Sequence, residues 1–203
     1  GPSILEGSPK DNAAGVDVKA DFILLWDRPI GEGYNYGDGF AGYSFKLVSD
    51  GHPDIDLVPQ INRNRLTLRH QEPLEYGVTY TLRIVDGAVS DKSGTNYNKD
   101  NYYLRFTAEE QRIAGTLPNH SAWDVLTNSI PEVRFIARAG RGYEFNNITL
   151  TGHSVAGDIA VPLRPRLEED RLLLVPEEEL SPDTLYTVFL PRGAVRFADG
   201  GIS

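Results

Sequence analysis

The sequence contains neither cysteine nor methionine. Without cysteine the chain cannot form disulfides, use a thiol in catalysis or bind zinc through thiolates. Without methionine it lacks an initiator residue, so we expect it to be a processed or excised piece of a longer protein. Its first three residues, Gly1-Pro2-Ser3, resemble the remnant of a cleaved tag, and the fold prediction therefore starts at residue 4.

Long apolar runs and clustered basic residues are also missing. No apolar stretch approaches the roughly 20 residues that span a bilayer, which predicts that this piece is not inserted in a membrane. Asp and Glu total 29 against 20 Lys and Arg, and the net charge is −9. Nucleic-acid binding needs clustered cations, so this charge argues against it. With 40% apolar and 24% charged residues, the composition is that of a globular protein.

What the sequence does contain is one pattern that occurs twice. The matched residues are Arg65 and Arg171, Tyr80 and Tyr186, and Gly94 and Gly200. Each pair is separated by 106 positions (171 − 65, 186 − 80 and 200 − 94). A constant spacing of this size indicates two domains of one fold. We place them at residues 4–108 and 112–203, joined by a few polar residues.

Strand signals dominate both repeats. Short segments alternate apolar and polar residues between turns rich in Pro, Gly, Asn and Asp, and no segment has the period of an amphipathic helix. Phe22–Trp26 is a continuous apolar run that predicts a buried central strand. The segment 7–15 has turn residues throughout, and 16–18 alternates as a short edge strand would. The fold class is therefore predicted as all-β, with two tandem Ig-like Greek-key β-sandwich domains.

The strand at Thr79–Ile84 allows its two faces to be assigned. By the period of two, Tyr80, Leu82 and Ile84 point into the core. Tyr80 and its repeat Tyr186 stand near the start of a late strand, after a turn. Ig-like sandwiches place a tyrosine corner there, whose hydroxyl bonds back to the backbone. We therefore interpret both tyrosines as structural.

The two repeats differ at their ends. The first continues past Gly94 into a strand at Tyr102–Phe106, whereas the sequence stops at Ser203, three residues after Gly200 (203 − 200). We expect the second domain to lack its final strand. The favoured interpretation is a fragment boundary or proteolytic cut. The alternative is an open groove that a strand from a partner completes.

A family resemblance is carried by several of these motifs together. They are Ser8-Pro9, the strand end Trp26-Asp27-Arg28-Pro29, Tyr80, and Gly87-Ala88-Val89 followed by Asp91 and Gly94. The combination resembles the fifth type of bacterial Ig-like domain, first noted in a cyanobacterial surface protein needed for swimming motility. The second repeat departs from it, with Phe197 where the first has Asp91 (197 − 91 = 106).

That resemblance implies a tandem spacer or adhesion module of a large bacterial protein. It implies an extracellular or cell-surface location, and partners that are neighbouring domains of the same polypeptide. The leading functional hypothesis is thus a non-catalytic spacer or adhesion module. The alternative is a carbohydrate-binding accessory module of a secreted polysaccharide-active enzyme, whose partner would be a cell-surface or extracellular polysaccharide.

One polar loop has the composition of a calcium site. Its oxygen-bearing residues are Asp91, Ser93, Asn96, Asn98 and Asp100. Calcium takes six to eight hard oxygen ligands, and this loop could supply several. It is not an EF-hand loop, because no bidentate Glu closes it. Asn and Asp are also ordinary turn residues, so a purely structural loop is the alternative.

A second loop has the composition of a glycan-binding surface. It is rich in Gly and carries Tyr34, Tyr36, Asp38 and Phe40. Exposed aromatic rings can stack on sugar rings, and the carboxylate could bond to hydroxyls. The alternative is that the aromatic side chains fold back over the end of the sandwich.

No catalytic site is evident. The histidines, which share no metal-binding spacing, are His52, His70, His120 and His153. Ser154 follows His153 but has neither a nucleophile elbow nor an evident orienting acid. The sequence therefore predicts no enzymatic activity and no cofactor other than the candidate calcium ion.

Overall fold

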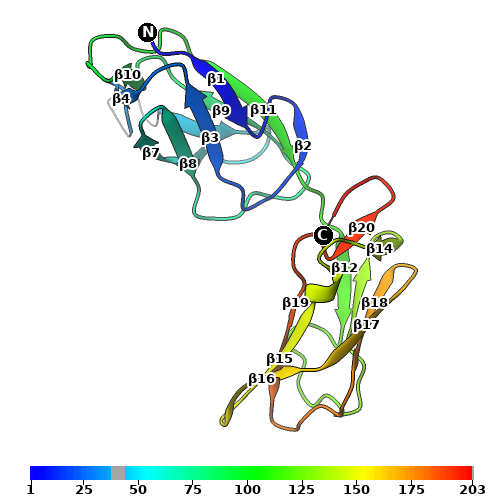
Figure 1. The fold of residues 1–203 in the computed structure, drawn as a ribbon. Coiled ribbons are helices and arrows are strands. Elements are labelled where there is room, and N and C mark those ends of the chain that lie inside the picture. Colours follow the sequence, from blue (N-terminus) through cyan, green and yellow to red (C-terminus); the bar gives the residue numbers. More distant parts are fainter. Residues whose placement is uncertain (38–43, 203) are drawn as a thin grey trace. The chain divides into compact units, whose positions relative to one another are not determined.

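The computed structural model describes residues 1–37 and 44–202. The chain divides into two compact units, Gly1–Glu110 (unit 1) and Gln111–Ser203 (unit 2), and Figure 1 labels most of their strands. Within the described residues the one helical element is η1, a 3₁₀ turn at Phe145–Asn147. None of the described helical segments is long and apolar enough to cross a membrane. The prediction of an all-β fold is confirmed.

Unit 1 is a sandwich of two sheets. Its strands are β1 (Ile4–Ser8), β2 (Ala13–Val16), β3 (Phe22–Trp26), β4 (Ile30–Glu32), β5 (Phe45–Val48), β6 (Ile55–Asp56), β7 (Val58–Asn62), β8 (Arg65–Arg69), β9 (Thr79–Ile84), β10 (Val89–Asp91) and β11 (Tyr102–Ala108). One sheet has the order β1-β3-β8-β7 and the other β2-β11-β9-β5-β6, while β4 and β10 form a separate pair. The chain crosses repeatedly between the two large sheets, as in Greek-key sandwiches.

The core of unit 1 follows from the alternation of its strands. In β9, Tyr80, Leu82 and Ile84 are buried, as predicted from the period of two. β3 lies between β1 and β8, so the apolar run forms a central strand, also as predicted. Its residues Phe22 and Leu24 are fully buried, and the alternate residues are half-buried. Each sheet thus contributes one apolar face to a shared interior.

The N-terminal region corrects one sequence interpretation. The segment 7–15 is not turn throughout, because β1 extends to Ser8 and β2 begins at Ala13. The predicted edge strand at 16–18 lies earlier in the chain, and Val18 is buried outside any strand. The reason is tertiary: β2 finds its partner in β11, about 90 residues later, and this pairing overrides the local turn preference.

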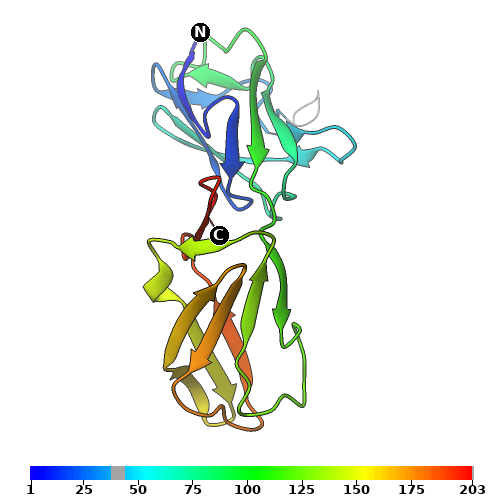
Figure 2. The ribbon, with the colours of Figure 1, turned by 90° about the vertical axis from the view of Figure 1, so that its right-hand side faces the viewer.

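The pair formed by β2 and β11 is parallel. Ala13 lies opposite Phe106 and Val16 opposite Ala108. The amide of Asn12 donates to the carbonyl of Arg105 at 2.6 Å, and the amide of Glu109 donates to the carbonyl of Val16 at 2.8 Å. Figures 1 and 2 show these two strands side by side. The last strand of unit 1 is therefore held between β2 and β9.

Unit 2 repeats most of this arrangement. Its strands are β12 (Ile113–Leu117), β13 (Glu132–Phe135), β14 (Ala139–Arg141), β15 (Thr149–Ser154), β16 (Gly157–Val161), β17 (Leu163–Glu168), β18 (Arg171–Pro176), β19 (Leu185–Phe189) and β20 (Val195–Phe197). The sheets have the orders β12-β13-β18-β17, β16-β15-β19 and β14-β20. Val133, Phe135, Leu172, Leu174 and Val195 are buried in its core.

The two units differ in the strand that pairs with the outer edge of β9 in unit 1, which is β11. At the repeat spacing of 106, β19 corresponds to β9, and among the described residues β19 pairs only with β15. Leu82 is fully buried, whereas its counterpart Val188 is 37% exposed. The described part of unit 2 contains no counterpart of β11, so one edge of β19 is unpaired.

Candidate functional site

The aromatic loop of unit 1 divides into an exposed and a buried part. Tyr34 is 63% exposed and meets the ring of Tyr97 edge-on, with centroids 4.9 Å apart. Tyr36 is half-buried against Phe45, and burial raises the pKa of its hydroxyl. Two further residues of the predicted glycan surface, Asp38 and Phe40, lie outside the described residues. Tyr34 thus offers an open ring, while Tyr36 folds back onto the sandwich.

The ring of Tyr34 also has a structural contact. Gly87 has a positive φ of 73°, and a Cβ at this position would lie 2.2 Å from Cζ of Tyr34. Unit 2 repeats this contact, since a Cβ at Gly193 would lie 2.3 Å from Cζ of Tyr143. In each unit the tyrosine ring therefore lies directly on a glycine of positive φ, where a larger residue would strain the backbone and displace the ring. Tyr143 was missed from the sequence, although each tyrosine follows a glycine in a Gly-Tyr pair.

The predicted calcium loop is held together by Asp91. Its two carboxylate oxygens accept hydrogen bonds from the Ser93 hydroxyl and the Asn96 side-chain amide, both at 2.6 Å. The amide of Thr95 donates to the same carboxylate at 3.2 Å. These hydrogen bonds, led by that of Ser93, lower the pKa of Asp91 well below its usual range. The carboxylate is thus engaged by protein donors.

The other two predicted ligands lie further along the loop. Asn98 is buried, and its side-chain oxygen accepts from the amide of Val89 at 3.0 Å. Its side-chain nitrogen donates to the carbonyls of Val85 at 2.8 Å and Asp100 at 3.4 Å. Among the described residues, no three His, Asp or Glu side chains are grouped to hold a metal ion. Calcium binding by this loop stays a prediction.

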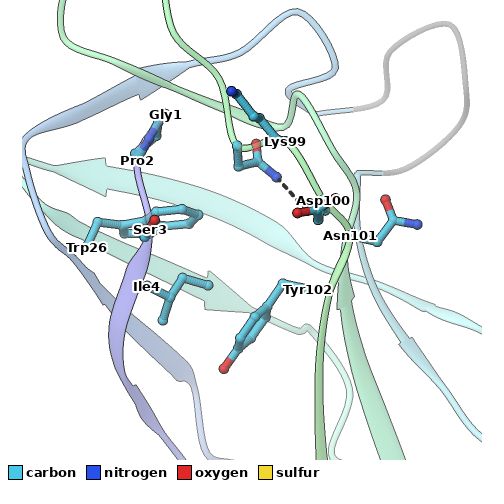
Figure 3. Close-up of a pocket in the computed structure, with 10 residues that line it drawn as sticks. Gly1, Pro2, Ser3, Ile4, Trp26, Lys99, Asp100, Asn101 and Tyr102 are labelled. Atoms are coloured by element: carbon cyan, nitrogen blue, oxygen red, sulfur yellow. Dashed lines mark hydrogen bonds between the residues drawn. The ribbon is translucent and has the colours of Figure 1, made fainter.

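A cleft of about 320 Å³ lies beside this loop. Figure 3 shows it between the start of β1 and the segment from Lys99 to Tyr102. Trp26 lines the cleft, and its indole nitrogen is buried without a hydrogen-bond partner in the described structure. The cleft offers polar groups to a ligand. Its lining contains no histidine, so it lacks the side chain that usually serves as a general base near neutral pH.

A polar trio in unit 2 corrects a second interpretation. His153 has an orienting acid after all: its Nδ1 lies 2.7 Å from Asp158, on the neighbouring strand β16. Its Nε2 lies 3.1 Å from the hydroxyl of Thr187, whereas the Ser154 hydroxyl bonds to the carbonyl of Gly157. The histidine and aspartate side chains are 36% and 70% exposed. In this solvated setting the trio is a cross-strand polar contact, without the water-excluded environment that strengthens catalytic electrostatics.

The predicted tyrosine corners are confirmed in both units. The hydroxyl of Tyr80 accepts from the amide of Glu75 at 3.0 Å, and that of Tyr186 accepts from the amide of Ser181 at 2.6 Å. Each bond reaches back five residues along the chain. Together with the paired sheets, this contact defines two Ig-like domains.

The family comparison agrees with that class. The bacterial Ig-like domain family matches residues 1–108, which is more than half of the 203 residues. The chain belongs to this family of bacterial Ig-like domains, which is a non-catalytic kind of domain. No curated protein matches the sequence.

Among solved structures, S-layer proteins are similar. The N-terminal part of the bacterial S-layer protein SbsC has 11% identity and a TM-score of 0.39, covering 94% of this chain and 44% of that one. Domains 1–6 of surface layer protein SbsC have 11% identity and a TM-score of 0.38, covering 94% and 26%. The S-layer protein rSbsC(31-844) has 10% identity and a TM-score of 0.38, covering 100% of this chain and 31% of that one. This chain spans less than half the length of each.

Proposed function

We propose that this chain is a non-catalytic spacer that carries tension between neighbouring domains of a bacterial secreted or cell-surface protein. Membership in the family of bacterial Ig-like domains supports this setting. The observation that carries the proposal is the parallel pairing of β2 with β11. These strands lie near the two ends of unit 1.

Parallel pairing makes unit 1 resistant to stretching along the chain. Tension pulls β2 toward its N-terminal end and β11 toward its C-terminal end, so the two strands are sheared past each other. Their contacts are then loaded together. Besides the two backbone bonds, the amide of Arg105 donates to the side chain of Asp11 at 2.9 Å. Separation in shear requires all of these bonds to break at once, which raises the force needed to unfold the domain.

Single-molecule stretching of the whole chain tests this function. We expect two unfolding events, with unit 1 requiring the higher force, because the described part of unit 2 has no counterpart of the β2–β11 pair. Asp11→Ala should lower the unfolding force of unit 1, since it removes the acceptor for Arg105. Asp50→Ala, at an exposed turn, is the matched control and should leave the force unchanged. Equal forces for both units, or no effect of Asp11→Ala, would refute the tension-bearing role.

The exposure of Tyr34 supports a second candidate, a carbohydrate-binding accessory module. Its ring presents an open surface next to Tyr97, an arrangement suited to stacking on a sugar. The test is binding of the purified chain to bacterial and plant polysaccharides. Tyr34→Ala should weaken binding, whereas Tyr103→Ala, at an exposed tyrosine on β11, should not. Unchanged affinity in the Tyr34→Ala variant would remove this candidate.

A further inference from the structure

His70 directly follows β8, and its ring bridges two loops of unit 1. Its Nδ1 lies 2.6 Å from the carbonyl oxygen of Glu72, in the loop 70–78 that joins β8 to β9. Its Nε2 lies 2.7 Å from the carbonyl oxygen of Ala20, in the loop 17–21 that joins β2 to β3. Both ring nitrogens are therefore held at hydrogen-bond distance from groups that can only accept.

The two carbonyl contacts of His70 need two N–H donors. A neutral imidazole has one N–H, and its other nitrogen carries a lone pair. In either neutral tautomer that lone pair would face a carbonyl oxygen at 2.6 or 2.7 Å, which is repulsive and leaves one contact unmade. The imidazolium has an N–H on each nitrogen and satisfies both carbonyls, and a charged donor makes the stronger hydrogen bond. The geometry therefore fits the protonated ring.

The charged groups around this ring favour a positive charge on it. Among the described residues, the histidines in ion pairs are His52, 3.0 Å from Glu75, and His153, 2.7 Å from Asp158, so no carboxylate pairs with His70 itself. The two loops and the end of β8 carry four carboxylates and two cations, which are Asp17, Lys19, Asp21, Arg69, Glu72 and Glu75. This excess of negative charge stabilises an imidazolium at their centre.

A backbone bond joins the same two loops in both units. In unit 1 the amide of Leu74 donates to the carbonyl of Val18 at 2.8 Å, and in unit 2 the amide of Leu180 donates to the carbonyl of Thr127 at 2.9 Å. The donors are 106 positions apart (180 − 74). The acceptors are 109 apart (127 − 18), which is also the spacing between the paired starts of β1–β3 and β12–β13 (113 − 4 = 135 − 26). The repeat thus preserves this connection.

The repeat does not preserve the histidine. At the spacing of 106 the counterpart of His70 is Pro176 (176 − 70), whose side chain has no hydrogen-bond donor. Unit 2 therefore forms the same loop connection without a titratable side chain. The histidine of unit 1 is an addition to a connection that the fold already has, and what it adds is a dependence on protonation.

We propose that His70 is a pH-dependent clamp, whose protonation ties the loop 17–21 to the loop 70–78 and stabilises unit 1 in mildly acidic conditions. The half-buried ring takes its proton from solvent. Histidine ordinarily gains a proton near pH 6.5, so the added stability is present below that pH and is lost as the pH rises above it. The same loops also hold the residue that follows β11, since the amides of Val18 and Gly77 donate to the side chain and the carbonyl of Glu109 at 3.4 and 2.9 Å. The clamp concerns equilibrium stability and does not depend on the tension-bearing role.

The test is urea denaturation of the whole chain at pH 5.5 and pH 8.5, with Trp26, which is buried in unit 1, as the fluorescent reporter. The variant is His70→Gln, whose amide nitrogen can donate at both pH values but carries no charge. We expect the wild-type midpoint to exceed that of the variant by at least about 0.5 M more at pH 5.5 than at pH 8.5. The comparison cancels the other titrating groups, including His52 of the same unit, because both proteins contain them.

Two further variants complete the test. His70→Ala removes both contacts and should show the same dependence on pH, which guards against a new partner for the glutamine. His120→Gln, at an exposed histidine of unit 2, is the matched control and should leave the Trp26 transition unchanged at both pH values. A stability difference between the wild type and the His70 variants that is equal at the two pH values, or larger at pH 8.5, would show that the ring acts in its neutral form and would overturn the proposal. No difference at either pH would overturn it as well.

Discussion

Truncation of matched residues in the two units gives a quantitative test of the fold. Leu82 in β9 is fully buried, and a buried Leu→Ala change costs 2–5 kcal/mol, about 3 here. Val188 is its counterpart in β19 but is 37% exposed. Removing its two methyl groups, each worth about 0.8 kcal/mol when buried, should cost about 1 kcal/mol, because the position opens to solvent and leaves no closed cavity.

The assay is urea denaturation of the whole chain. Trp26 is buried in unit 1 and reports that unit by fluorescence, while circular dichroism follows both units. For domains of this size the urea dependence is about 1.5–2 kcal/mol per M. Leu82→Ala should therefore lower the midpoint of the Trp26 transition by about 2 M. Val188→Ala should lower that of unit 2 by about 0.5 M. Comparable losses for the two variants would refute the inference that β19 lacks a covering strand.

Three further predictions concern polar contacts. The pKa of Asp91 is lowered in the fold, so its contribution to stability is present above about pH 4 and is lost as the pH falls through the folded pKa. The difference in melting temperature between the wild type and Asp91→Asn should therefore shrink below pH 4. If the loop holds calcium, a chelator should lower the wild-type melting temperature. Tyr80→Phe should cost about 1 kcal/mol in chemical denaturation and Tyr186→Phe less, because Tyr186 is only half-buried and water can replace its bond. Glu132 is 8% exposed and pairs with Arg134 at 3.1 Å and Arg171 at 3.4 Å. Glu132→Ala removes both ion pairs and should destabilise unit 2 by about 2 kcal/mol in chemical denaturation. The control Glu178→Ala, at an exposed position, should leave the stability unchanged.

The features that the sequence predicted correctly depend on local alternation and on the repeat. The inward faces of β9 and the two tyrosine corners needed only the period of two and the spacing of 106. Each is set by residues close together in the chain. The central position of β3 followed from its continuous apolar run for the same reason.

The features that it did not predict depend on which strands become neighbours. β2 was hidden among turn residues, because its partner β11 lies about 90 residues away. Asp158 meets His153 only through the register of β15 with β16. The contact of Tyr34 with Gly87 likewise joins distant segments. Asn98 has the composition of a turn residue, but its side chain satisfies buried backbone groups, which requires knowledge of the surrounding fold.

Hydrogen exchange of the free chain tests most directly whether one Ig-like unit is closed by a final strand while the other has an open edge. β9, at Thr79–Ile84, is paired on both sides by β11 and β5, whereas β19, at Leu185–Phe189, is paired only with β15. The account predicts slow exchange throughout β9. In β19, the amides that point away from β15 should exchange early. Equally slow exchange in both strands would contradict the open edge of β19.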